Sequence, residues 1–245
     1  MQFDFFSRLR SPLFALVCLC TAWGALAQGQ EVLIRKNLQE RIPQFPKIDE
    51  ISKAAMPGLY EIRVDGTDIY YTDAEGNFLI QGQLIDTRSR RNLTEERIDK
   101  LTAIDFQSLP LKDAFTIVRG NGKRKLAVFE DPNCGYCKRF ERDLQKVDNI
   151  TVYLFLYPIL GQDSVEKSRN IWCAKDRAKA WQDAMLREQP AGNANCDTAA
   201  LQRNVEFGRK HKINGTPTLI TAEGNRVPGA ISTAQIEKLL AEAAK

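Results

Sequence analysis

A strand, a helix and a second strand follow one another in the second half of the chain, and this order restricts the fold more than any other feature. Residues 125–130 form a short apolar run, residues 134–147 have a helical pattern, and residues 150–157 form a near-continuous apolar and aromatic run. The last run is typical of a strand buried on both faces. Because a helix separates the two strands, they are expected to pair in parallel. The sequence therefore predicts an α/β domain.

Further helical sequence surrounds this unit. Helical patterns at residues 164–188 and 198–210 predict a helical insertion in the α/β domain. Two short strand patterns flank Glu223-Gly224 and predict a hairpin. Ser232 and Gln235 are spaced as a capping box, which predicts a final amphipathic helix.

The chain from residue 28 to residue 92 has a different pattern, dominated by short strands. A helix is expected over residues 31–42, ended by Pro43. Three strand-like runs follow at residues 58–64, 67–72 and 78–86. Asp65-Gly66 between the first two is a strong signal for a tight hairpin. These runs predict a small antiparallel sheet, and hence an α+β N-terminal domain.

A connecting helix is expected between the two domains. Asn92 and Glu95 form a capping box for a helix that runs to about residue 105. The polar segment before it ends the strand pattern. Residues 93–105 are therefore interpreted as a linker helix, and residues 106–245 as the α/β domain.

The first 27 residues have the pattern of a cleaved secretory signal. Arg8 and Arg10 precede an apolar run over residues 13–23, and Ala25-Leu26-Ala27 offers the small residues that a signal peptidase needs. A membrane anchor or a buried helix is the alternative. The apolar run is shorter than the roughly 20 residues that span a bilayer. We therefore expect an exported, soluble protein.

The net charge and the number of cysteines limit the classes of function that the chain can have. The formal net charge of +4 at pH 7 is too small to predict binding to nucleic acid or to a membrane surface. Removal of the predicted signal discards Cys18 and Cys20. Four cysteines remain, namely Cys134, Cys137, Cys173 and Cys196. An even number in an exported chain indicates disulfides, because that compartment does not keep thiols reduced.

The segment Cys134-Gly135-Tyr136-Cys137 follows the first strand of the parallel unit and opens its helix. A thiol at a helix N-terminus faces unpaired N–H groups and the positive end of the helix dipole. Such positions lower a cysteine pKa from about 8.5 to between about 3.5 and 7.5. Cys134 is therefore expected to be a nucleophile. Cys137, one turn further into the helix, is the natural resolving thiol.

Zinc binding and a purely structural disulfide are the alternatives for this pair. A zinc site would need a second cysteine pair at short spacing, whereas Cys173 and Cys196 lie far apart in the sequence. No metal site is predicted. Cys173 lies in a helical segment and Cys196 in a polar loop, so these two are interpreted as a structural staple, that is, a structural disulfide.

His211, flanked by Arg209, Lys210 and Lys212, is interpreted as a solvated helix-end residue, and its position does not favour a Cys-His hydrolase.

Four motifs match a known family. They are Cys-Gly-Tyr-Cys at 134–137, Ile-Trp-Cys-Ala-Lys-Asp at 171–176, Asn-Gly-Thr-Pro at 214–217 and Val-Pro-Gly at 227–229. Together with the domain order, they make residues 28–245 resemble the DsbC and DsbG family of bacterial periplasmic disulfide isomerases. The Gly-Tyr pair between the cysteines is similar to DsbC, whereas DsbG typically has Pro-Tyr.

The resemblance implies a role for each matching residue. Cys134 matches the attacking cysteine, Cys137 the resolving cysteine, and Cys173 with Cys196 the structural disulfide. Pro217 matches the cis-proline of thioredoxin-like folds. Thr216 precedes it in the loop that contacts the substrate backbone, and Gly135 and Tyr136 are likewise expected to contact substrate. Thioredoxin itself has a buried carboxylate shortly before its first cysteine, where this chain has Val128. Glu130 and Asp131 lie nearer the cysteines, with no role assigned.

The implied activity is rearrangement of wrong disulfides in exported proteins. A mixed disulfide on Cys134 leads to isomerisation when a substrate thiol displaces it, and to reduction when Cys137 does. No cofactor is implied. The resemblance also implies a periplasmic homodimer joined through residues 28–92, chaperone-like binding, and a membrane reductant of the DsbD type. The alternatives are a DsbG-like protector of single cysteines, a dimeric chaperone with an incidental cysteine pair, and a monomer with an N-terminal cap.

Overall fold

The computed structural model describes the backbone of residues 19–242 and the side chains of residues 29–241. It divides into two compact units between Leu101 and Thr102. Most of the predicted signal, residues 1–18, lies outside the described residues, and residues 19–27 begin the first helix. Over the described range, no helix is both long enough and apolar enough to cross a bilayer.

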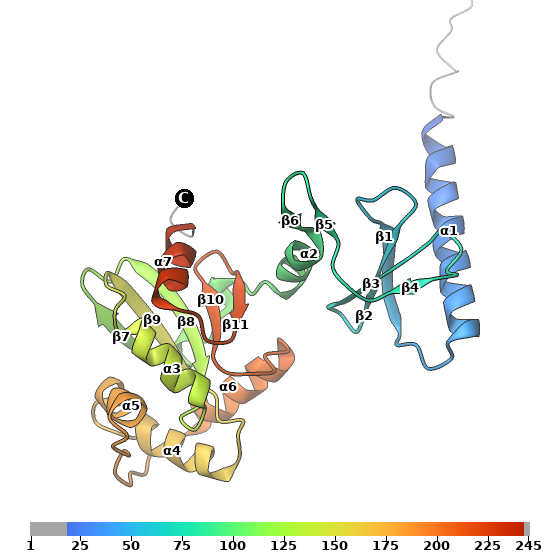
Figure 1. The fold of residues 1–245 in the computed structure, drawn as a ribbon. Coiled ribbons are helices and arrows are strands. Elements are labelled where there is room, and N and C mark those ends of the chain that lie inside the picture. The colour runs from blue at the N-terminus through green and yellow to red at the C-terminus, as the bar shows by residue number, and fades with distance from the viewer. Residues whose placement is uncertain (1–18, 243–245) are drawn as a thin grey trace, which may run out of the picture. The chain divides into compact units, whose positions relative to one another are not determined.

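The N-terminal unit contains a helix, α1, that packs on a small antiparallel sheet (Figure 1). Helix α1 spans Leu19–Arg41, and so begins well before the predicted Glu31. The sheet has the order β1-β2-β3-β4, with bounds Ile48–Lys53, Tyr60–Val64, Asp68–Thr72 and Leu79–Ile80. Ile34 and Leu38 of α1 are buried against the apolar face of this sheet. The unit confirms the predicted α+β N-terminal domain.

The hairpin at Asp65-Gly66 is confirmed. Val64 pairs with Asp68, and both Asp65 and Gly66 have positive φ angles, 47° and 82°. Glycine adopts this left-handed conformation at no steric cost, and aspartate tolerates it better than most residues. The turn therefore fixes the register of β2 and β3.

Two predictions for this sheet were wrong. Strand β1 is absent from the predicted strands, because a bulge between Ile48 and Glu50 breaks the alternating pattern of a regular strand. The run over residues 78–86 is not one strand. Its end forms β5 (Ile85–Asp86), which pairs with β6 (Arg91–Asn92) in a separate two-stranded hairpin.

Helix α2 spans Leu93–Thr102 and begins as the capping box predicted. The Glu95 backbone N–H donates to Asn92 Oδ1 at 3.2 Å, and the Asn92 amide donates to the Glu95 carboxylate at 3.2 Å. The helix ends before the predicted residue 105. A 3₁₀ turn, η1 (Phe106–Ser108), follows, capped by the Asp105 side chain.

The second unit is built on a five-stranded sheet of order β11-β10-β8-β9-β7. In chain order the strands are β7 (Phe115–Arg119), β8 (Arg124–Glu130), β9 (Ile150–Leu156), β10 (Thr218–Thr221) and β11 (Arg226–Pro228). Strands β8 and β9 pair in parallel, as predicted, and the other pairs are antiparallel. Strand β7, preceded by the 3₁₀ turn η2 (Leu111–Asp113), had not been predicted.

In the described part of this unit, five helices pack around the sheet (Figure 1). They are α3 (Gly135–Leu144), α4 (Gln162–Trp172), α5 (Arg177–Leu186), α6 (Ala199–Lys210) and α7 (Thr233–Glu242). The predicted helix over 164–188 is two helices, because Asp176 caps α5 by accepting from the Lys179 N–H at 2.9 Å. The α/β domain with a helical insertion is confirmed.

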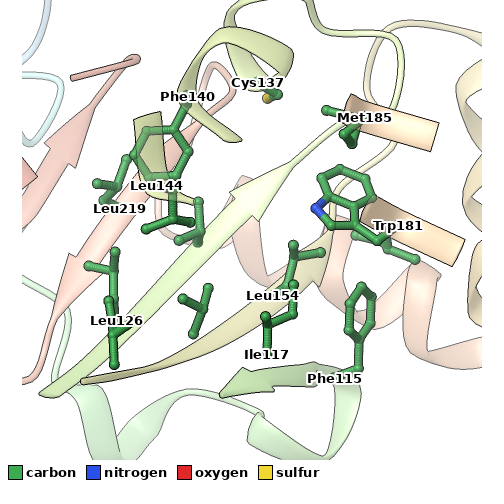
Figure 2. Close-up of a cluster of buried hydrophobic side chains, with 14 of the residues drawn as sticks. Phe115, Ile117, Leu126, Cys137, Phe140, Leu144, Leu154, Trp181, Met185 and Leu219 are labelled. Carbon is green, nitrogen blue, oxygen red and sulfur yellow. The ribbon is translucent and has the colours of Figure 1, made fainter. Parts of the chain in front are cut away.

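Strand β8 is buried on both faces. Leu126 and Val128 point into a cluster that contains Cys137 and side chains of α3 and α5, whereas Ala127 and Phe129 point into the cluster on the other face. Figure 2 shows Phe140 and Leu144 of α3 with Trp181 and Met185 of α5 in the first cluster. The sheet therefore lies between two packed layers, one of which contains the start of α3.

Replacement of Gly208 by alanine should destabilise the second unit. A Cβ atom there would lie 2.4 Å from Cε2 of Tyr157, whose hydroxyl donates to the Ile213 carbonyl at 2.8 Å. Overpacking of this kind costs about 1–3 kcal/mol, so Gly208→Ala should lower the free energy of unfolding in urea by about 2 kcal/mol. Gly192→Ala is the control, because its added Cβ meets nothing within 4 Å. An unchanged free energy for Gly208→Ala would contradict this packing.

Candidate active site

Cys134 lies at the point where the chain leaves β8 and enters α3. It is the N-cap residue of α3, with extended backbone angles, and the Cys137 backbone N–H donates to its sulfur at 3.4 Å. The Lys138 N–H donates to the Cys134 carbonyl at 3.1 Å, which begins the helical hydrogen bonding. The sulfur therefore occupies the capping position that a serine or aspartate side chain takes in other helices.

The surroundings of Cys134 favour its ionised form. Its pKa is lowered from the ordinary thiol value to about 5, chiefly through a hydrogen bond from the Cys137 side chain, and burial opposes this shift. Hydrogen bonds from the Thr216 side chain and from the backbone N–H groups of Cys137 and Tyr136 lower the pKa of Cys134 further. At neutral pH the sulfur is therefore a thiolate.

The surroundings of Cys137 have the opposite effect. Cys137 is fully buried, while Cys134 keeps 6% of its surface exposed. Burial raises the pKa of Cys137 far above its ordinary value, and the hydrogen bond to Cys134 and the charge of Glu130 add to this. Both cysteines are free thiols in the structure. The pair thus has one ionisable sulfur near the surface and one protonated sulfur inside.

A loop that lies much later in the sequence of this unit, and that carries Thr216 and Pro217, packs against Cys134. The peptide bond between Thr216 and Pro217 is cis. As a thiol, Cys134 donates to the Thr216 carbonyl oxygen at 3.2 Å. The loop is anchored where the Gly229 N–H donates to the Pro217 carbonyl at 2.8 Å. Residues 82 positions apart in the sequence are thus in direct contact.

The two residues between the cysteines face outward. Tyr136 is 67% exposed, and a Cβ atom added at Gly135 would meet nothing within 4 Å. Thr216, whose carbonyl contacts the Cys134 sulfur, is half-buried, and Pro217 after it is buried. Of the four residues singled out as substrate contacts by the resemblance, Gly135 and Tyr136 are therefore exposed beside Cys134, whereas Pro217 is not.

Asp131 organises the loop before Cys134, a role that had not been assigned from the sequence. Its buried carboxylate accepts hydrogen bonds from four donors: the backbone N–H groups of Asn133 (2.8 Å), Ile159 (2.8 Å) and Leu160 (3.0 Å), and the Ser164 hydroxyl (2.7 Å). Its carbonyl accepts from the Cys134 N–H at 3.0 Å. A charged residue directly after an apolar strand is the only sequence signal for this role.

Cys173 and Cys196 form a disulfide with an S–S distance of 1.96 Å and a Cα–Cα distance of 5.5 Å. It ties the end of α4 to the loop before α6, where the Trp172 indole N–H also donates to the Asp197 carbonyl at 3.1 Å.

His211 lies at the C-terminal end of α6 and is partly exposed. Its ring stacks on that of Phe207, with 4.3 Å between the ring centroids. Over the described residues, no group of three potential ligands could hold a metal ion.

Comparisons with known proteins agree with this geometry. A family model described as the N-terminal domain of disulfide bond isomerase proteins matches residues 25–95, and a thioredoxin-like domain model matches residues 111–244. The chain is 45% identical to a probable thiol:disulfide interchange protein DsbC of Bordetella pertussis, over 83% of this chain and 73% of that protein.

More distant relatives extend the match. The thiol:disulfide interchange protein DsbC of Escherichia coli K12 is 28% identical over 94% of this chain and 95% of its own length. A crystal structure of a disulfide interchange protein from Neisseria gonorrhoeae has a TM-score of 0.53 and 38% identity, over 56% of this chain and 99% of that one. The chain therefore belongs to the DsbC family of thiol:disulfide interchange proteins, and it is a thiol:disulfide oxidoreductase with a thioredoxin-like domain.

Proposed function

We propose that the chain is a periplasmic protein disulfide isomerase and reductase in which Cys134 attacks non-native disulfides. The observation that carries this proposal is the contrast between the two sulfurs: the pKa of Cys134 is lowered to about 5, while burial raises that of Cys137. The thiolate is the reactive form of a thiol. Only Cys134 is therefore ready to attack at neutral pH.

The reaction proceeds through a mixed disulfide. The Cys134 thiolate attacks one sulfur of a substrate disulfide, a new S–S bond forms, and the other substrate sulfur leaves as a thiolate. If a substrate thiolate then displaces Cys134, the disulfide has moved with no net change in oxidation. If Cys137 displaces the substrate, the substrate is reduced and Cys134–Cys137 is oxidised. A reductant of the DsbD type would then restore the two thiols.

We propose that substrate binds across Gly135, Tyr136 and Thr216, and that Pro217, which is buried, contributes to this site by shaping the loop that carries Thr216. The exposed Tyr136 ring offers an apolar contact that does not depend on one substrate sequence. The Thr216 carbonyl oxygen lies 3.2 Å from the Cys134 sulfur, so a polypeptide that follows this loop brings its own sulfur to Cys134. Recognition through backbone and aromatic contacts suits an enzyme whose substrates are misfolded proteins.

The remaining proposals concern the division of the chain into segments and the role of its N-terminal unit. We propose that residues 1–27 are a cleaved signal, that residues 28–92 form a dimerisation domain, and that residues 93–105 link it to a catalytic domain over residues 106–245. Within the described residues of this unit, several large apolar side chains are exposed, among them Met56 and Phe78 at 56% and 69%. Exposed apolar side chains and open sheet edges favour association with a second copy and chaperone-like binding of unfolded chains.

The isomerase proposal is tested with a scrambled multi-disulfide protein as substrate. Cys134→Ser should abolish recovery of native disulfides, because no other described cysteine combines a lowered pKa with access to solvent. Cys137→Ser should keep measurable isomerisation but trap mixed disulfides with the substrate. Full activity of Cys134→Ser would reject the assignment. Faster turnover of sulfenylated single-cysteine proteins than of scrambled ones would instead indicate a protector of single cysteines.

The pH dependence of alkylation tests the ionisation of Cys134. Because its pKa is lowered to about 5, the rate of its reaction with iodoacetamide should reach half its maximum near that pH and stay constant through neutrality. Cys137→Ala removes the largest cause of the shift, so its midpoint should move upward. Unfolded protein is the control, with a midpoint near the ordinary value of about 8.5. A midpoint of about 8.5 in the folded enzyme would contradict the proposal.

A further inference from the structure

The sequence contains two Asn-Gly pairs, Asn121-Gly122 and Asn214-Gly215. An asparagine that precedes glycine is prone to deamidation, because glycine has no side chain to shield its peptide nitrogen and its backbone turns freely. In this reaction the peptide nitrogen of the glycine attacks the side-chain amide carbon of the asparagine. The reaction therefore requires a peptide nitrogen that is not held in a hydrogen bond, an asparagine side chain that is free to rotate, and space for the ring that forms.

The first pair is held in a conformation that opposes this reaction. The Gly122 N–H donates to the Arg119 carbonyl at 3.2 Å, so its nitrogen is engaged. The Asn121 side-chain oxygen accepts from the Lys123 N–H at 3.0 Å, and the Asn121 N–H donates to the Asn149 side chain at 3.1 Å. Attack at this pair would have to break hydrogen bonds that fix both reacting groups.

The second pair lies in the loop that carries Thr216 and Pro217, and its reacting groups are open. Asn214 and Gly215 are both exposed and lie outside any helix or strand. Within the described residues, the structure shows no hydrogen bond of the Asn214 side chain or of the Gly215 N–H. A Cβ atom added at Gly215 would meet nothing within 4 Å, so there is space beside this nitrogen for a ring. All three requirements are therefore met at Asn214.

The chain on either side of this pair is anchored. The Ile213 carbonyl accepts from the Tyr157 hydroxyl at 2.8 Å, and the Gly215 carbonyl accepts from the Thr218 hydroxyl at 2.7 Å. The peptide bond between Asn214 and Gly215 is thus an unanchored unit between two anchored ones. Its groups are accessible to water while the rest of the domain stays folded.

We propose that Asn214 deamidates spontaneously in the folded protein and that the product disturbs the substrate-binding loop beside Cys134; the effect on substrate binding rests on the proposed function. The Gly215 nitrogen forms a bond to Cγ of Asn214, the bond from Cγ to Nδ2 breaks, and ammonia leaves with the proton of that nitrogen. A succinimide ring results, and water opens it. Cleavage at Cγ gives aspartate, whereas cleavage at the backbone carbonyl carbon gives isoaspartate.

Both products change the surroundings of Cys134. The Thr216 carbonyl oxygen lies 3.2 Å from its sulfur. Consecutive Cα atoms are about 3.8 Å apart, so the Cα of Asn214 lies within about 8 Å of that of Thr216. Either product places a negative charge on this loop, which disfavours the thiolate. Isoaspartate also adds a carbon atom to the backbone, and this displaces the Thr216 carbonyl from the position in which it meets the sulfur.

Peptide mapping by mass spectrometry tests the chemistry without measuring activity. In native protein kept at neutral pH, Asn214 should be converted at least about tenfold faster than Asn121, because Asn121 reacts only in locally opened molecules. In protein unfolded in guanidinium chloride, the two sites should react at similar rates, because the protecting hydrogen bonds are lost. Equal rates at the two sites in the native protein, or no conversion of Asn214, would overturn the proposal.

Two matched variants link the modification to activity. Glutamine keeps the amide, but its longer side chain forms the corresponding ring far more slowly. Asn214→Gln should therefore keep its initial activity during the incubation, while the wild type loses activity in step with the conversion of Asn214. Asn121→Gln is the control and should lose activity as the wild type does. Equal losses in Asn214→Gln and the wild type would overturn the link between the modification and activity.

The isoaspartate form, separated from unmodified protein by ion exchange, tests the effect on the loop. Its kcat/KM for reduction of a disulfide-bonded peptide should be about tenfold lower, because a displacement of about 1 Å in a positioning group costs up to 10²-fold. An unchanged kcat/KM would overturn the effect on substrate binding. If instead fresh wild type fails to rearrange scrambled disulfides, the proposed function fails, whereas the mapping result is unaffected.

Freshly prepared Asn214→Asp tests the charge alone. A unit charge roughly 10 Å away in water changes a pKa by about 0.3, so the midpoint for alkylation of Cys134 should rise by about 0.3 pH unit. Asn121→Asp is the matched control and should leave the midpoint unchanged, because Asn121 lies outside the loop that contacts the sulfur. Equal midpoints in Asn214→Asp and the wild type would overturn the effect of this position on Cys134.

Discussion

The contact of Cys137 with the Cys134 sulfur, through the Cys137 side chain and its backbone N–H, is the interaction on which the site depends. It exists because the parallel pairing of β8 and β9 fixes where α3 begins, so that the sulfur meets the first turn of the helix (Figure 1). Asp131 holds the loop that precedes this sulfur, and the carbonyl of Thr216, which precedes the cis peptide bond to Pro217, contacts the sulfur. The fold thus places a negative charge where unpaired N–H groups stabilise it.

The lowered pKa of Cys134 affects its quality as a leaving group as well as its readiness to attack. A thiol with a low pKa is a good leaving group, so in the proposed reaction a substrate thiol would displace Cys134 readily from a mixed disulfide. The same property makes it a weaker nucleophile per thiolate than an ordinary cysteine, although at neutral pH nearly all of it is ionised. This balance favours mixed disulfides that form and resolve repeatedly, as rearrangement of several wrong bonds requires.

The sequence predicted the elements whose pattern is local. The parallel unit around α3, both capping boxes and the hairpin at Asp65-Gly66 follow from periodicity and short-range hydrogen bonding. Strand β1 was missed because its bulge breaks the alternation, and the cis peptide before Pro217 was expected only through the family resemblance. The part played by Asp131 could not be predicted, because its four donors come from segments up to 33 residues away. A carboxylate after a strand reads in sequence as a solvated loop residue.

Burial separates the chemistry of the two cysteines. The apolar cluster around Phe140 and Trp181 contains Cys137, and burial there raises the pKa of its thiol. Cys134 belongs to the same cluster but keeps some exposed surface, and hydrogen bonds from Cys137 outweigh the effect of burial on its pKa. Because an ionised sulfur is costly in an apolar interior, two sulfurs within one helical turn have different protonation states at neutral pH.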